Sequence, residues 1–187
     1  MTTAPNNKPA RELAGAVVTL RAAVDADVAA LARIRATPQV RARWRGGTDL
    51  AAEVREAIAD NGLRFLTIRQ GQRIVGGIQW AAEDDPEYRH ASIDIFVDPA
   101  AHGRGLGTDA VRALVAYLVE VEGFHRIVID PAADNRAAIR CYEKAGFRAV
   151  GIMRQYERGA DGRWHDGLLM DLLADDLKAP GSAADPG

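Results

Sequence analysis

The sequence SIDIFVDPAAHGRGLGTDAVRALVAYLVEV, residues 92–121, decides the fold of this chain. It begins as an alternating apolar strand, passes through a loop with glycine at every second position, and continues with apolar residues at helical spacing. A strand that leads through glycines into a helix presents unpaired backbone N–H groups and the positive end of the helix dipole to an anion. The stretch therefore predicts a strand–loop–helix unit that binds a phosphate or pyrophosphate group.

The rest of the sequence predicts one α+β domain around this unit. The expected order is βααβββαβαββ, a mixed and mostly antiparallel central sheet flanked by about four helices, with parallel strands next to the glycine loop. Asp25 and Asp134 precede two of the helices and are expected to cap them. The expected strands are 17–21, 65–69, 74–80, 90–97, 126–130, 147–156 and 168–173, and the expected helices cover 28–34, 49–60, 108–121 and 135–145.

Composition and length limit the class of protein. The 187 residues, 48% of them apolar, suffice for one domain with its own core, which we place at 13–177, between a flexible arm at 1–12 and a flexible tail at 178–187. A net charge of −2 excludes a protein that holds nucleic acid mainly through phosphate contacts. The single Cys141 excludes a disulfide scaffold, and no Cys or His pairs have zinc spacing. No apolar stretch reaches the roughly 18 residues of a membrane helix. Because of the lone cysteine and the lack of zinc-like pairs, we expect a protein of the reducing cytoplasm without bound metal.

The glycine loop has two further interpretations. Its glycines can simply form a flexible turn, or the loop can belong to a dinucleotide-binding fold, with Asp130 as the acidic residue that such folds place about 20 residues after the loop. The second interpretation needs a G-x-G-x-x-G pattern directly after a strand and several βαβ units. Here the loop reads G-x-G-x-G, residues 99–102 separate it from the strand, and only one βαβ unit is expected.

Residues 93–147 resemble the GNAT superfamily of acetyl-CoA-dependent N-acetyltransferases. The family pattern [Q/R]-x-x-G-x-[G/A] matches HGRGLG at 102–107, with His102 in place of Gln or Arg, and the family's later helix with an Asn and a Tyr matches DNRAAIRCYEKAGF at 134–147. The resemblance implies acetyl-CoA as the acetyl donor, with the backbone N–H groups of Phe96 and Val97 polarising the thioester carbonyl. The cofactor-binding residues that it implies are Phe96, Val97, His102, Gly103, Arg104, Gly105, Leu106, Gly107, Thr108, Asn135 and Tyr142.

Two side chains are candidates for the chemistry. Tyr142 lies two helical turns after Asn135, so both can face one groove, and the resemblance makes this protonated phenol the general acid for the leaving thiolate. Asp94 is unusual inside a strand and points away from the face of Ile93 and Ile95, where it can accept the proton of the substrate ammonium or hold that ammonium by charge. The alternatives are a core tyrosine beside Phe147 and a solvated carboxylate.

Cys141 suggests a covalent acyl-enzyme, but it points about 100° away from its neighbour on the helix and no histidine stands nearby in the sequence. We therefore expect a small buried hydrophobic side chain and direct acetyl transfer.

Within the superfamily, the motifs are most similar to those of aminoglycoside 6′-N-acetyltransferases. An aminoglycoside is a polycation on stacked rings, so its pocket needs carboxylates and flat apolar walls. We expect these from Trp80, Asp84, Asp94 and Asp130. Five arginines between positions 33 and 45 argue for another acceptor, because they repel a polycation and suit an acidic protein, a ribosomal partner or a carboxylated small amine.

Three functions therefore stay open: aminoglycoside acetylation, acetylation of protein N-termini or small amines, and coenzyme A binding without catalysis. We expect a small-molecule amine as partner, no nucleic acid, no membrane, and a monomer or homodimer.

Overall fold

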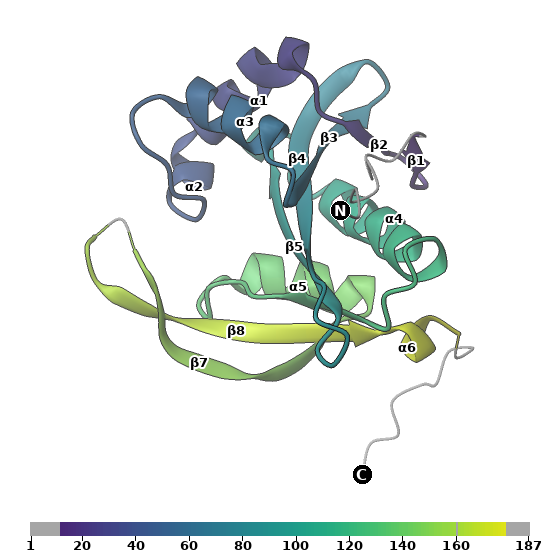
Figure 1. The fold of residues 1–187 in the computed structure, drawn as a ribbon. Helices are drawn as coiled ribbons and strands as arrows, with labels where there is room; N and C mark the ends of the chain where they lie inside the picture. The colour runs from purple at the N-terminus through teal and green to yellow at the C-terminus, as the bar shows by residue number, and fades with distance from the viewer. Residues whose placement is uncertain (1–11, 160, 179–187) are drawn as a thin grey trace, which may run out of the picture.

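The structure, a computed structural model, describes residues 12–159 and 161–178 (Figure 1). The arm expected at 1–12 and the tail expected at 178–187 lie almost wholly outside this part of the chain. Within the described residues, no helix is long and apolar enough to span a membrane.

One eight-stranded sheet, in the order β1-β2-β3-β4-β5-β6-β8-β7, forms the centre of the domain (Figure 1). All neighbouring strands are antiparallel except β5 and β6, the two strands that the glycine loop and α4 connect. The mixed, mostly antiparallel sheet that we expected is therefore confirmed. The strands are β1 (Leu13–Ala14), β2 (Thr19–Ala22), β3 (Leu63–Gln70), β4 (Arg73–Glu83), β5 (His90–Val97), β6 (Arg126–Ile129), β7 (Arg148–Arg158) and β8 (Trp164–Leu173).

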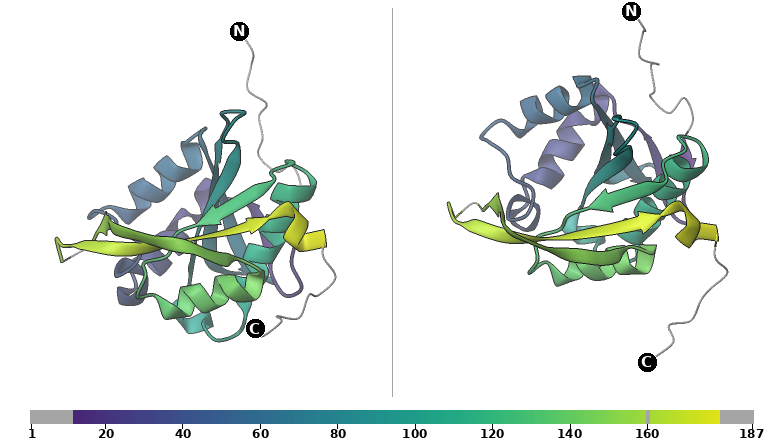
Figure 2. Two further views of the ribbon diagram at one scale, coloured as in Figure 1. Left: turned by 90° about the horizontal axis from the view of Figure 1, so that it is seen from below. Right: turned by 60° about the horizontal axis from the view of Figure 1, so that its bottom comes forward.

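The helices lie on both faces of this sheet (Figures 1 and 2). Helices α1 and α3 pack on β3 and β4, whereas α4 packs on the opposite face and carries α5 against it. The helices are α1 (Val28–Arg35), α2 (Pro38–Arg41), α3 (Leu50–Ala59), α4 (Leu106–Glu120), α5 (Arg136–Ala145) and α6 (Ala174–Lys178), with short 3-10 turns η1 (Asp25–Asp27) and η2 (Pro99–Ala101).

Two hydrophobic cores result, one on each face. The larger core joins the sheet to α4, whose Val111, Leu114 and Leu118 are fully buried at helical spacing. The smaller core lies under α1 and α3 and contains Phe65 and Phe96. Side chains that alternate along β5 therefore enter different cores, because Ile93 belongs to the first and Phe96 to the second.

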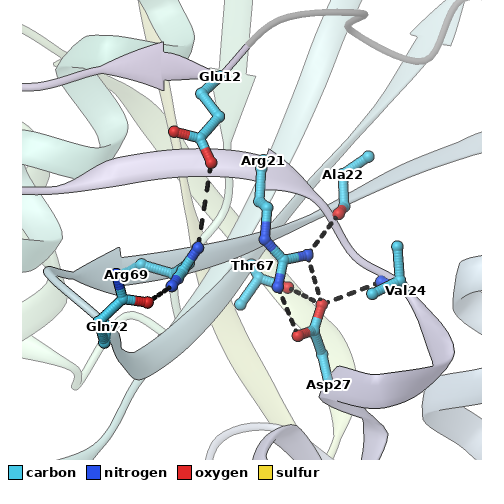
Figure 3. Close-up of polar contacts among 8 residues, drawn as sticks. All are labelled: Glu12, Arg21, Ala22, Val24, Asp27, Thr67, Arg69 and Gln72. Carbon is cyan, nitrogen blue, oxygen red and sulfur yellow. Dashed lines mark hydrogen bonds and ion pairs between the residues drawn. The ribbon is translucent and has the colours of Figure 1, made fainter.

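A buried carboxylate ties the first helices to the sheet (Figure 3). Asp27, 3% exposed, accepts two hydrogen bonds from Arg21 at 2.7 and 2.8 Å, and others from Val24 N at 3.0 Å and the Thr67 hydroxyl at 3.0 Å. Burial by itself raises the pKa of this carboxyl, but these donors outweigh burial and hold the pKa below its usual value. The carboxylate therefore stays charged and joins η1, β2 and β3.

The parallel strands β5 and β6 separate soon after they meet. Their pairing consists of Ala91 with Ile127 and Ser92 with Val128, whereas β5 continues to Val97. Continuing the same register places Asp94 opposite Asp130, at the point where the two strands part. The topology thus brings to one gap two carboxylates that are far apart in the sequence.

Three local expectations need correction. Asp27 rather than Asp25 is the N-cap residue of α1, and its carboxylate accepts from Val24 N, which precedes η1, instead of capping α1, while Asp25 pairs with Arg55 at 3.3 Å. Asn135, rather than Asp134, caps α5 by accepting from Ala138 N at 3.3 Å. Helix α4 begins at Leu106 rather than at 108. An N-cap is set by backbone geometry, and where Asp or Asn residues stand side by side the sequence alone does not select between them.

Candidate active site

The glycine loop forms the entry to α4. Gly103 and Gly105 adopt left-handed backbone conformations, with φ of 74° and 76°, and open space surrounds the position of a Cβ atom at each. Gly105 is the N-cap and offers no side chain to the first turn, so the backbone N–H groups that open the helix are not capped from within the loop. Asp109, the acid of this turn, is occupied elsewhere, because its carboxylate accepts from the backbone N–H groups of residues 16–18 at 2.8–2.9 Å.

Contacts to three other elements hold this loop in place. His102 Nε2 lies 3.0 Å from the Val97 carbonyl oxygen at the end of β5, and Arg104 donates to the Gln70 side chain at 2.9 Å. The Thr108 hydroxyl donates to the Cys141 carbonyl at 3.3 Å and lies 3.2 Å from its sulfur, which connects α4 to α5. Leu106 is buried in the core, so its side chain does not face a ligand.

Asp94 lies in the middle of β5, on the same face of the sheet as Phe96. It is exposed to solvent, and its carboxylate accepts a hydrogen bond from the Gln79 amide at 3.2 Å. Burial by the surrounding protein raises the pKa of Asp94; the Gln79 hydrogen bond opposes this shift, and the negative charge of Asp130 adds to it. A carboxylate that water can reach but that is poorly solvated is suited to accept a proton.

Asp130 follows β6 directly and has a different partner. Burial raises its pKa, while a hydrogen bond donated by the Tyr156 hydroxyl lowers it. The same hydrogen bond is the largest cause that raises the pKa of Tyr156, to about 12. The two facing carboxylates therefore have distinct environments, an amide donor for Asp94 and a phenol donor for Asp130.

Tyr142 lies on the buried side of α5, and its ring contacts Phe147 with centroids 6.3 Å apart. Burial raises the pKa of its phenol well above the usual value, and the charges of Cys141, Asp94 and Asp130 raise it further. None of the described residues accepts a hydrogen bond from its hydroxyl. The ring therefore packs in the core, and the hydroxyl is a protonated, unengaged donor near the carboxylates. Its role as general acid stays a prediction.

Two predicted acceptor-binding residues lie away from this group. Trp80 pairs with Ile93 and is buried against Phe124, whereas Gln79 pairs with Asp94, so Trp80 is on the opposite face of the sheet from Asp94. Asp84 belongs to the turn that precedes β5, at the opposite end of this strand from the glycine loop. Neither residue therefore joins Asp94, Asp130 and Tyr142, because the expectation counted residue types near β5 without the hairpin register. A role of Trp80 or Asp84 in acceptor binding stays a prediction.

The expected pair of backbone donors is also reduced to one. Asp98 N donates to the Val75 carbonyl of β4 at 2.7 Å. Because the N–H and C=O groups of successive strand residues point to opposite sides, those of Val97 point away from β4, toward the gap between β5 and β6. Those of Phe96 face β4, where a Cβ atom on Gly76 would collide with the Phe96 carbonyl oxygen. The Phe96 ring packs against Trp44, with centroids 4.9 Å apart.

Sequence reasoning missed two residues of the site, Gln79 and Tyr156. Gln79 carried a signal, because it is polar inside an apolar strand on the face that alternation assigns to Asp94. Tyr156 carried none, since its approach to Asp130 depends on an irregularity in β7.

The arginines between 33 and 45 are partly neutralised. Arg35 is buried and pairs with Glu53 at 2.8 Å, and Arg43 pairs with Asp134 at the start of α5. The basic segment is thus joined by an ion pair to the start of α5, the helix that carries Tyr142. Arg33, Arg41 and Arg45 stay exposed.

The splayed parallel strands, the glycine loop and the flanking carboxylates define an acyltransferase fold of the coenzyme A-dependent type. Residues 18–148 match the family model described as "Acetyltransferase (GNAT) domain". The chain belongs to this family.

Named relatives lie in the same family. The chain is 45% identical over 75 residues to an aminoglycoside N(6′)-acetyltransferase type 1 of Klebsiella pneumoniae, a match that covers 40% of this chain but only 36% of that relative. It is 46% identical over 78 residues to a kanamycin resistance protein of Rhizobium radiobacter, covering 41% of this chain and 70% of the relative.

A solved structure of the aminoglycoside acetyltransferase AAC(6′)-Ib in complex with coenzyme A and kanamycin superposes with a TM-score of 0.71. It is 26% identical in sequence, and the superposition covers 86% of this chain and 97% of that one.

Proposed function

We propose that this protein transfers the acetyl group of acetyl-CoA to a primary amine of an aminoglycoside, directly and within a ternary complex. The observation that carries the proposal is the pair of carboxylates, Asp94 and Asp130, that face one another where β5 and β6 separate, beside a glycine loop that begins α4.

The glycine loop supports acetyl-CoA as the donor. Its left-handed glycines leave the backbone accessible, and uncapped N–H groups at the start of α4 suit a pyrophosphate. Arg104 at the rim adds a positive charge, while His102 and Thr108 brace the loop. When bound, acetyl-CoA supplies the thioester as electrophile and a thiolate as leaving group.

The protons are handled by Asp94 and Tyr142. Asp94, with its raised pKa, accepts a proton from the substrate ammonium and leaves a neutral amine as nucleophile. The Val97 N–H, turned into the gap, donates to the carbonyl oxygen on which negative charge develops. Tyr142 gives its proton to the departing thiolate. The nitrogen, once bonded to the acetyl carbon, loses a second proton, which returns to the Tyr142 phenolate, and Asp94 releases the first proton to solvent, so both residues regain their starting states.

Two facts favour an aminoglycoside among amines. Asp94 and Asp130 provide anionic groups for a ligand with several ammonium groups. The named relatives with 45–46% identity are an aminoglycoside N(6′)-acetyltransferase and a kanamycin resistance protein.

A thiol-release assay with acetyl-CoA tests the proposal, using kanamycin, spermidine and a peptide with a free N-terminus as acceptors. We expect kanamycin to give the highest kcat/KM. If none of the three acceptors raises thiol release above the buffer rate, the proposed chemistry is contradicted. If only the peptide is acetylated, the proposal that the acceptor is an aminoglycoside is contradicted.

The second candidate is acetylation of an acidic peptide or a carboxylated amine. The exposed Arg33, Arg41 and Arg45 favour it, because they attract an acceptor that carries negative charge. Replacing all three by Gln lowers kcat/KM for such an acceptor, and leaves it unchanged or higher for a polycation.

A further inference from the structure

Strand β7 loses its regular pairing with β8 next to the proposed site. Met153 pairs with Gly167 and Glu157 with His165, so residues 154–156 lie opposite Asp166 alone. In the middle of this bulge, Gln155 has a φ of 51°, the one positive φ at a residue other than glycine in the described part of the chain. A left-handed glutamine is unfavourable by itself and persists only where its surroundings hold it.

Two contacts hold the bulge. Gln155 N donates to Asp166 Oδ1 at 2.8 Å, which fixes the left-handed residue to β8. The Tyr156 ring lies over Gly167, where an added Cβ atom would approach Tyr156 Cδ1 to 2.9 Å. A bulge of this kind redirects a side chain relative to a regular strand. Here it sets the Tyr156 ring beside Gly167, next to Leu168, whose N donates to the Pro131 carbonyl at 2.8 Å, and so brings Tyr156 to the chain segment that begins with Asp130.

The surroundings of Asp130 explain why a phenol is placed there. Among the described residues, the ionisable groups that shift the pKa values of Asp94, Asp130, Tyr142 and Tyr156 are these four together with Glu157 and the Cys141 thiol, and none of them carries a positive charge. Without a donor, two facing carboxylates favour protonation of one of them. A phenol stabilises the charged form of Asp130 without bringing a cation that would repel an ammonium group.

We infer that Tyr156, set by the bulge at Gln155, is a positioning residue that holds Asp130 as a second anionic point for an acceptor with an additional ammonium group. This inference rests on the proposed function. Asp94 serves the amine that is acetylated, whereas Asp130 binds another ammonium of the same acceptor. Tyr156 therefore affects the KM for multiply charged acceptors more than the rate of acetyl transfer.

The test compares two acceptors that offer the same kind of primary amine: kanamycin, which has several ammonium groups, and 6-amino-6-deoxyglucose, which has one. We expect Tyr156→Phe to raise the KM for kanamycin about tenfold, equivalent to about 1.4 kcal/mol. The KM for 6-amino-6-deoxyglucose, the KM for acetyl-CoA and kcat stay within twofold. Tyr88→Phe is the matched control, since Tyr88 is exposed in the turn before β5.

A second pair of variants separates positioning from a general packing effect. Asp166→Ala removes the acceptor for Gln155 N and repeats the Tyr156→Phe pattern, whereas Asp166→Asn keeps an Oδ1 acceptor and stays close to wild type. Tyr156→Phe removes the donor that lowers the pKa of Asp130, so this pKa rises. On acidification, the KM for kanamycin therefore starts to increase at a higher pH in the variant than in wild type.

The outcomes distinguish the two proposals. If wild type acetylates no amine, the proposed function fails and this inference fails with it. If wild type acetylates kanamycin but Tyr156→Phe leaves its KM unchanged, or raises the KM of both acceptors equally, the inference alone is overturned.

Discussion

The donor side and the acceptor side of the proposed site are built in different ways. The donor side is a continuous segment, 102–108, whose function depends on backbone N–H groups and on two left-handed glycines. The acceptor side consists of side chains from β5, the end of β6, α5 and β7, which the sheet topology brings together. One half is therefore encoded locally, and the other depends on register and on a bulge.

The largest effect is expected on the acceptor side, from Asp94. Asp94→Asn removes the proton acceptor but keeps the shape and a hydrogen-bond partner for Gln79, so kcat/KM for the amine falls by about 10²–10⁴-fold. The affinity for coenzyme A, measured by calorimetry, stays unchanged. Asp84→Asn is the control, because this carboxylate lies in the distant turn. Equal activity of Asp94→Asn and wild type removes Asp94 from the mechanism.

On the donor side, Gly105→Ala tests the backbone. A residue with a Cβ atom disfavours the φ of 76°, by about 1 kcal/mol, so the loop relaxes and the KM for acetyl-CoA rises about five- to tenfold. Gly123→Ala is the matched control, with a φ of 71° and open space in a turn beyond α4. It loses similar stability in thermal unfolding without the change in KM. A higher KM in both variants points to global destabilisation instead.

The pH dependence follows from Asp94. Its pKa is raised, so kcat/KM falls on acidification at a pH above the ordinary aspartate value of about 3.9. A raised folded-state pKa also means that ionisation of Asp94 opposes folding, and that this loss of stability develops as the pH rises from the unfolded-state pKa to the folded-state pKa. Asp94→Asn therefore raises Tm at pH 7. If the residual activity of Asp94→Asn falls on acidification at the same pH as that of wild type, the fall in kcat/KM is caused by another group.

The smallest effect is expected from Cys141. Its thiol contacts the Thr108 hydroxyl, and burial raises its pKa, which opposes a nucleophilic thiolate. Cys141→Ala therefore changes kcat less than twofold, and intact-mass measurement of the wild type with acetyl-CoA detects no acetylated enzyme. Detection of acetylated enzyme would contradict direct transfer and indicate a two-step reaction through an acyl-enzyme.

The same contrast explains how far the sequence predicted the molecule. The glycine loop and the strands and helices beside it could be recognised because their signals are local: alternation, helical periodicity and glycines at positive φ. Asp94 could be singled out because aspartate is uncommon inside strands, whereas Asp130 was predicted because the pocket for a polycation needs carboxylates. Trp80 was misplaced and Tyr156 missed, because their surroundings depend on the β4–β5 register and on a bulge that no periodicity marks. The additional elements β1, α2 and α6 are only 2–5 residues long, too short for a periodic signal.

The most direct measurement is the rate of thiol release from acetyl-CoA with kanamycin as acceptor, for wild type and for Asp94→Asn side by side. The account predicts saturable turnover by wild type and a loss of about 10²-fold or more in kcat/KM for the variant, with coenzyme A binding intact in both. Saturable turnover that is unaffected by Asp94→Asn would contradict the central role of the facing carboxylates.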